Sequence, residues 1–144
     1  GDGSMVIEFD VDSIKGKARP EFRRAGKKVI TYDSKNKEPE KLIRDAFLKA
    51  SRSYKTPLEG AIGVEISTYK KLPKSKPKRI LSEPDIFKPD IDNIIKLVFD
   101  ALNGVAYDDD KQIVKVQAKK FPRRRIEKDK LHVKIYRLDG YELD

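Results

Sequence analysis

Carboxylates dominate one short part of this sequence. Residues 83–110 contain eight acidic side chains and two basic ones, although the chain as a whole has a formal net charge of +9. Carboxylates that lie close together repel one another and raise one another's pKa unless a cation neutralises them. Oxygen ligands favour Mg²⁺ or Mn²⁺ over zinc. The candidate metal ligands in this block are two pairs of aspartates, Asp90 with Asp92 and Asp109 with Asp110.

A helix and the turn after it must position these carboxylates. Apolar residues at spacings of three to four predict a helix over residues 92–102, with Asp90 or Asp92 as its N-cap. The Asn-Gly pair at residues 103–104 is typical of a helix end. The second pair of aspartates directly precedes a strand predicted over residues 112–121. If that strand runs back beside the helix, we expect the four carboxylates to converge at one place.

Lys96 lies one helical turn after Asp92. Beside a metal that activates water, its ammonium group could orient the attacking water or neutralise charge that develops on a scissile phosphate. This combination predicts phosphodiester hydrolysis. Taken separately, the parts have simpler interpretations. The YDDD sequence at residues 107–110 is typical of a turn. The polar side of the helix, formed by Asp92, Lys96, Asp100 and Asn103, is on this interpretation an ordinary solvated surface with i,i+4 ion pairs.

The basic excess lies in three segments. Residues 15–28, 70–79 and 119–125 hold seven, six and five Lys or Arg residues. Such patches attract polyanions by releasing condensed counterions, although lysine-rich loops can also serve only to keep a protein soluble. Three of them around an acidic block favour nucleic acid as the partner. The predicted nucleic-acid contacts are Lys17, Arg19, Arg23, Arg24, Lys27, Lys74, Lys76, Arg123 and Arg124.

Composition excludes several kinds of site. The chain has no cysteine and a single histidine, His132, which excludes disulfides, thiolate zinc sites, cysteine nucleophiles and a histidine-rich metal site. No run approaches the roughly 18 apolar residues that cross a bilayer, and no signal peptide is visible, so we expect a soluble, intracellular protein. The 144 residues fit one domain over residues 5–144, with residues 1–4 a remnant of an expression tag.

Helical and alternating apolar patterns occur together along the chain. They indicate an α/β (α+β) fold with a single mixed β-sheet and two main α-helices packed on it. The first helix is predicted within residues 34–54. The strands are predicted over residues 5–11, 28–33, 60–69, 112–121 and 131–138.

Two segments resemble a known family. The sequence KPDIDNIIKLVFDALNGVAYDDDKQIV, starting at Lys88, closely resembles the signature of RusA-type Holliday-junction resolvases, approximately D-x-D-N-x-x-K-x-x-x-D-A-L, a glycine-containing turn and D-D-x-Q-V. The sequence GKARPEFRRAGKKVITYD, starting at Gly16, is similar to the family's N-terminal G-R-P-R-F segment and the strand after it. The resemblance implies a RusA-like fold. It also implies a homodimeric, Mg²⁺-dependent endonuclease, with Mn²⁺ able to substitute, that nicks opposite strands of four-way junction DNA symmetrically in recombination and repair.

The resemblance also assigns roles to individual residues. It implies that the essential carboxylates and the essential lysine are Asp90, Asp92, Asp110 and Lys96. The resemblance matches Asp109 to the first aspartate of D-D-x-Q, as a metal ligand or a supporting residue. It matches Asp100 to the helix part of the signature, as a structural residue or one that supports the metal ligands. Gln112 sets the register, although Asp108 precedes the usual pair of aspartates. Glu21 stands where the family often has arginine, which weakens the match in the N-terminal segment.

Two other functions stay open. The protein could be a metal nuclease that acts on flaps, forks or RNA, or a non-catalytic protein that binds junctions or other nucleic acid. The resemblance implies a cytoplasmic protein of bacterial or prophage origin, with no membrane and no small-molecule substrate. The apolar side of the helix over residues 92–102 is a candidate dimer surface, with core packing as its other use.

Overall fold

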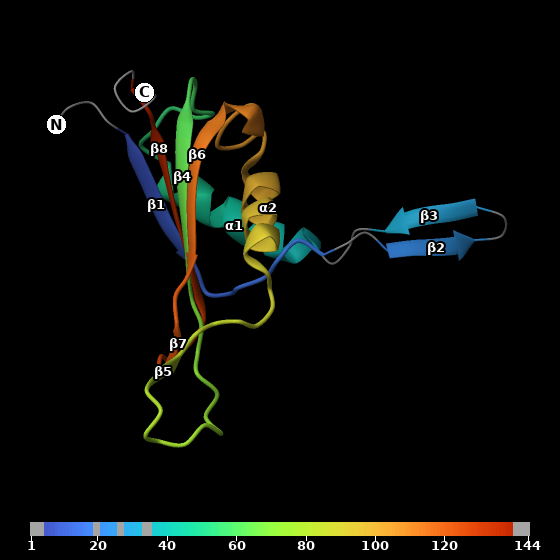
Figure 1. Cartoon of the computed structure of the whole chain (residues 1–144). Helices are drawn as coiled ribbons and strands as arrows, with labels where there is room; N and C mark the ends of the chain where they lie inside the picture. The colour runs from blue at the N-terminus through green and yellow to red at the C-terminus, as the bar shows by residue number, and fades with distance from the viewer. Residues whose placement is uncertain (1–4, 19–20, 26–27, 33–35, 140–144) are drawn as a thin grey trace.

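The computed structural model describes residues 5–18, 21–25, 28–32 and 36–139, so the C-terminal end of the predicted domain and the predicted tag remnant lie outside it. A four-stranded sheet in the order β1-β8-β4-β6 forms its centre (Figure 1). Strands β4 and β6 are parallel, whereas β8 pairs antiparallel with both β1 and β4. The strands of this sheet are β1 (Val6–Val11), β4 (Ile62–Tyr69), β6 (Ile113–Lys120) and β8 (Lys130–Arg137).

Two helices, α1 (Lys37–Ala50) and α2 (Ile91–Leu102), cover one face of this sheet in the described part of the chain. Alternate residues of β8 are buried, as expected for a strand with one covered face. Phe47 of α1 is fully buried and meets Phe9 of β1 edge to face, with ring centroids 6.2 Å apart. The predicted α+β fold, one mixed sheet with two helices on it, is therefore confirmed.

The crossover from β4 to β6 contains most of the candidate site. The chain leaves the end of β4, passes through β5 (Ser82–Glu83), returns along α2, and enters β6 after the short 3-10 helix η2 (Asp110–Gln112). Strand β5 pairs with β7 (Arg123–Arg124) in a small second sheet beyond the ends of β4 and β6 (Figure 1). Helix α2 thus runs antiparallel to the two strands that it connects.

A hairpin extends away from this body (Figure 1). It consists of β2 (Glu21–Ala25) and β3 (Lys28–Tyr32), which pair antiparallel. Strand β3 matches the prediction for residues 28–33, but β2 lies in a segment expected to be a basic loop. Residues 21–25 contain a single large apolar residue, so periodicity gives no strand signal there. No helix among the described residues is long and apolar enough to cross a membrane.

Phe47 tests the packing of α1 on the sheet. We expect Phe47→Ala to lower the free energy of unfolding by about 3–5 kcal/mol, because it removes a fully buried ring and leaves a cavity. Denaturant unfolding at one protein concentration measures this loss. The neighbouring Leu48 is 48% exposed, so Leu48→Ala should cost less than about 0.5 kcal/mol. Equal losses in the two variants would contradict this packing.

Candidate active site

The first pair of aspartates lies at the start of α2. Asp90 is the N-cap, with extended backbone angles of φ −66° and ψ 151°, and its carboxylate makes no capping hydrogen bond. Asp92 is in the first turn of the helix, and both side chains are exposed. Lys96 is also exposed, and because it follows Asp92 by four residues it lies on the same side of α2. These three groups face solvent, where a substrate can reach them.

The second pair lies in a tightly hydrogen-bonded turn. The Asp109 carboxylate accepts a hydrogen bond from the Lys111 backbone N–H at 2.8 Å. The Gln112 side-chain oxygen accepts from the backbone N–H groups of Asp108 and Asp109 at 2.9 and 3.1 Å. The Gln112 side-chain amide also donates to the carbonyls of Leu58 and Gly60 at 2.9 and 3.1 Å. Gln112 therefore fixes this aspartate turn to the loop that leads into β4.

The turn closes directly on the C-terminal end of α2. Gly104 has a φ of +80°, and its backbone N–H donates to the Tyr107 carbonyl at 2.8 Å. The Tyr107 hydroxyl donates to the Phe99 carbonyl at 2.8 Å. Burial raises the pKa of Tyr107 well above its ordinary value, and the negative charges of Asp110 and Asp100 raise it further. The hydrogen bonds of Gly104 and Tyr107 thus hold the start of the aspartate turn against the last turn of α2.

The two pairs of aspartates consequently lie at opposite ends of α2 (Figure 1). A helix of 12 residues is about 18 Å long. The predicted convergence of Asp90, Asp92, Asp109 and Asp110 within one chain is wrong. The strand does run back beside the helix, but the chain reverses only after the whole helix, so the second pair stays at the far end. Among the described residues, no group of three or more His, Cys, Asp or Glu side chains is placed to hold a metal ion.

The order of these motifs along the chain matches a known family. The family model for Endodeoxyribonuclease RusA matches residues 13–136. The chain belongs to the RusA endodeoxyribonuclease family. The Bacillus subtilis (strain 168) protein named "Uncharacterized protein YqaN" is 33% identical over 84 residues, which are 53% of this chain. The matched region spans 59% of the length of that relative.

One aspartate of the RusA signature supports the fold at this site. The Asp100 carboxylate lies 3.1 Å from the Lys17 ammonium, which is also 2.6 Å from the Glu40 carboxylate. Burial lowers the pKa of Lys17, but its hydrogen bonds to the two carboxylates and their negative charges outweigh that effect and raise the pKa. Lys17, predicted to contact nucleic acid, thus connects α2, α1 and the segment after β1.

The other predicted nucleic-acid contacts differ in their surroundings. Lys74 and Arg124 are exposed, whereas the Lys76 ammonium lies 3.2 Å from a carboxylate oxygen of Glu83. Arg19 and Lys27 are outside the described residues, and only the backbone of β2 is described around Arg23 and Arg24.

Arg123 is not the surface residue that its basic segment suggested. It is 8% exposed, its Nε lies 3.3 Å from Glu83, and its guanidinium lies 4.1 Å from the centroid of the Phe87 ring. The pairing of β5 with β7 places Glu83 opposite Arg123 and causes this burial. Arg123 faces the inside of that small sheet and Arg124 faces the outside. Because residues 123–125 are all arginine, the sequence gives no sign of this alternation.

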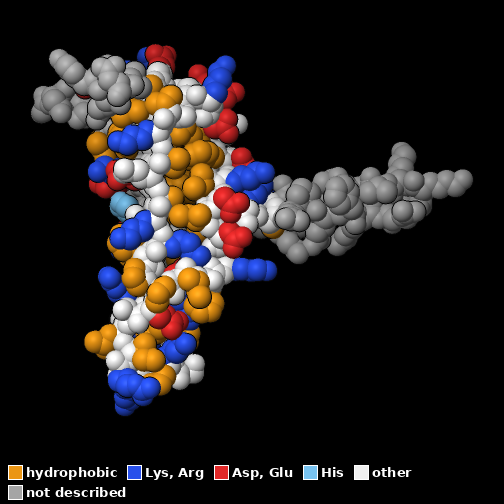
Figure 2. Space-filling view, viewed as in Figure 1, with side chains coloured by type: hydrophobic (Ala, Val, Ile, Leu, Met, Phe, Trp, Pro, Cys, Tyr) orange, Lys and Arg blue, Asp and Glu red, His pale blue; other side chains and the backbone are white. Residues whose placement is uncertain are grey.

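Apolar side chains remain uncovered between α2 and β6. Val116 pairs with the buried Val64 of β4, so it faces the helices, yet it is 42% exposed because β6 is the edge strand. Val114 is 55% exposed, and Ile91 at the start of α2 is 40% exposed. Figure 2 shows this strip of hydrophobic side chains along β6 and α2, with acidic groups at its margin.

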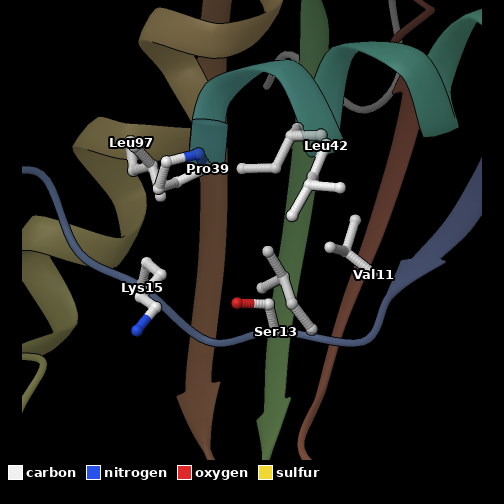
Figure 3. A pocket seen from close by; sticks show the side chains of 8 residues that line it. Val11, Ser13, Lys15, Pro39, Leu42 and Leu97 are labelled. Atoms are coloured by element: carbon white, nitrogen blue, oxygen red, sulfur yellow. The ribbon is translucent and has the colours of Figure 1, made fainter. Parts of the chain in front are cut away.

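A separate pocket lies beside α1 and the segment after β1 (Figure 3). Val11, Pro39 and Leu42 line it together with Leu97 of α2. None of the candidate aspartates contributes to this pocket. Its lining is mainly apolar, which is typical of an imperfectly filled gap at the margin of the core.

Gln112 allows a test of how the aspartate turn is held. In Gln112→Glu a carboxylate would replace the amide that donates to the Leu58 and Gly60 carbonyls. We expect this change to lower the free energy of unfolding by about 1–3 kcal/mol, because the partly buried Leu58 carbonyl loses its donor, whereas the exposed Gly60 carbonyl can bind water instead. Gln117→Glu, on the exposed part of β6, is the matched control and should have little effect in the same denaturant titration. If both variants unfold alike, Gln112 does not hold the turn.

Proposed function

We propose that this protein is a Mg²⁺-dependent endodeoxyribonuclease that acts as a homodimer and resolves four-way junctions by paired, symmetric cuts in DNA recombination and repair. The observation that carries this proposal is the RusA family match over residues 13–136, which contains the whole acidic signature. The exposed carboxylates and Lys96 support a nuclease over a protein that only binds DNA. Mn²⁺ is expected to substitute for Mg²⁺ because both prefer oxygen ligands.

The separation of the two aspartate pairs explains why a dimer would be needed. Strand β6 has one edge without a partner strand in the described part of the chain, and apolar side chains are exposed beside it. A twofold axis through this surface would set two β6 strands antiparallel. It would also reverse the direction of α2 in the second copy. The Asp109 and Asp110 end of each chain would then approach the Asp90 and Asp92 end of the other.

Each of the two sites would take residues from both chains. One chain would supply Asp90, Asp92 and Lys96, and the other would supply Asp109 and Asp110. These carboxylates offer the all-oxygen ligand set that suits Mg²⁺, although within one chain they are too far apart to share an ion. A metal bound there would supply an activated water and stabilise the departing oxygen.

The remaining residues of the site would act on the DNA itself. Lys96 faces solvent one turn after Asp92, where its charge would stabilise the phosphate in the transition state. Exposed cations such as Lys74 and Arg124 would hold the phosphate backbone on either side. Two sites related by twofold symmetry match the symmetry of a four-way junction, so two related strands would be cut.

Cleavage of a labelled synthetic four-way junction in Mg²⁺ tests the activity. We expect paired symmetric nicks by the wild type and a loss on the order of 100-fold or more in Asp90→Asn, Asp92→Asn and Asp110→Asn, with junction binding retained. Asp108→Asn is the matched control, because Asp108 is an exposed aspartate of the same turn outside the signature register. Linear duplex, flaps, forks and RNA are the competing substrates.

Different outcomes support different functions. Tight junction binding without nicks in Mg²⁺ or Mn²⁺ would indicate a non-catalytic binding protein. If flaps, forks or RNA are cut faster than the junction, the preferred substrate is one of these and not the junction. Loss of activity in Asp108→Asn but not in Asp110→Asn would show that the essential carboxylate of this turn is not Asp110 and that the register of the signature is wrong.

Mixed dimers test whether each site is shared between chains. We expect dimers of one Asp92→Asn chain and one Asp110→Asn chain, purified through two different tags, to nick a single strand of the junction. One shared site of such a dimer keeps both aspartates, whereas the other loses both. If instead each chain holds its own complete site, both sites of the mixed dimer carry a substitution and no nick should appear. Dimers of each variant alone are the controls.

A further inference from the structure

Two lysines lie at the edge of the sheet where α2 begins. Strands β4 and β6 are parallel and end together, with Thr68 paired to Lys120. Lys120 is the last residue of β6, and Lys70 directly follows β4. Both belong to the basic segments of the sequence, yet their side chains are only 14% and 16% exposed. They therefore point into the protein at this edge.

Both ammonium groups hold the main chain that leads to Asp90. Lys70 Nζ donates to the Lys88 carbonyl at 2.5 Å, and Lys120 Nζ donates to the Phe87 carbonyl at 2.5 Å. Asp90, the N-cap of α2, follows Lys88 by two residues. Strands β4 and β6 are thus connected directly to the segment that carries the first pair of aspartates.

A buried carboxylate stabilises this arrangement of like charges. The Asp85 side chain is 1% exposed, and its Oδ1 lies 3.6 Å from Lys70 Nζ and 3.9 Å from Lys120 Nζ. The same oxygen accepts a hydrogen bond from the Phe87 backbone N–H at 3.3 Å. Its Oδ2 is buried without a hydrogen-bond partner. Two ammonium groups that converge on adjacent carbonyls repel each other, and a buried carboxylate between them offsets that repulsion.

We infer that Lys70, Lys120 and Asp85 are positioning residues that set where Asp90 and Asp92 lie relative to the sheet. The inference rests on the proposed function in assigning catalysis to those aspartates. A displacement of about 1 Å in a reacting group can reduce a rate on the order of 100-fold, so a loosened segment should impair cutting more than binding. All three side chains are largely buried, at 1% to 16% exposed, so they act through the segment and not by direct contact with DNA.

The test compares Lys120→Met with Lys120→Arg, which retains a donor at the Phe87 carbonyl, in the full chain. Amide hydrogen exchange followed by mass spectrometry reports the position of the segment independently of activity. We expect exchange over residues 86–92 to accelerate about tenfold or more in Lys120→Met and to remain near wild type in Lys120→Arg. Exchange over β4 should not change. Asp85→Asn should accelerate exchange over the same residues, since the repulsion between the lysines is then uncompensated.

Cleavage and binding are measured on the same variants. We expect the cleavage rate of Lys120→Met to fall roughly 10- to 100-fold, with junction affinity and its salt dependence unchanged, and Lys120→Arg to recover most of the rate. Thr68→Val is the matched control. Thr68 is buried beside Lys120 in the sheet register, and its hydroxyl makes no hydrogen bond. Thr68→Val alters the same neighbourhood without removing a donor to the segment, so it should cut like the wild type.

Several results would overturn the inference. Unchanged exchange over residues 86–92 in both Lys120→Met and Asp85→Asn would show that the segment is held by other contacts. Faster exchange throughout the sheet would indicate general destabilisation instead of positioning. A lower junction affinity with a reduced salt slope would make Lys120 a phosphate contact. If the wild type cuts no DNA, the proposed function fails, whereas the exchange measurement still decides whether these residues hold the segment.

Discussion

The parallel pairing of β4 with β6 determines where the candidate catalytic residues lie. Parallel neighbours cannot be joined by a tight hairpin, because the chain must return from the end of one strand to the start of the next. Helix α2 makes that return, so its first residue lies where the strands end and its last residue lies where they begin. One pair of aspartates is carried to each edge of the sheet. Every later feature of the site depends on this separation.

The two pairs of aspartates lie at the edges of the sheet where α2 begins and where it ends, and they are held in different ways. At the start of α2, cations from the ends of both strands bind main-chain carbonyls, with Asp85 buried between them. At the other edge, the Gln112 side chain and the short 3-10 helix hold the aspartate turn through hydrogen bonds with the backbone. In both places the supporting groups are turned inward and the carboxylates of the signature are left exposed. The supporting residues therefore leave these carboxylates accessible to substrate.

The basic residues of the chain fall into two groups, those bound inside the protein and those exposed to solvent. Several lysines and arginines that look like DNA contacts in the sequence are engaged with carboxylates or carbonyls inside the protein, Arg123 and Lys120 among them. The exposed cations remain for a polyanionic partner. The apolar strip between α2 and β6 is a third kind of surface, and it lies between the two edges that hold the aspartates. In the proposed dimer, this position would link the association of two chains to the completion of each site.

Local sequence patterns predict the four strands of the central sheet, the two helices and the chemical types of the candidate site, but not β2, β5 or β7. The α+β class, the bounds of α2 within one residue and the candidate catalytic residues all follow from local patterns, since helix periodicity, turn residues and a motif of fixed spacing are properties of neighbouring residues. The tertiary arrangement places the aspartate pairs at opposite ends of α2, a helix about 18 Å long, buries Arg123, and brings Lys70, Lys120 and Asp85 together. Those facts depend on which strands pair and in which direction, and strand pairing is a contact between distant residues that no local pattern records.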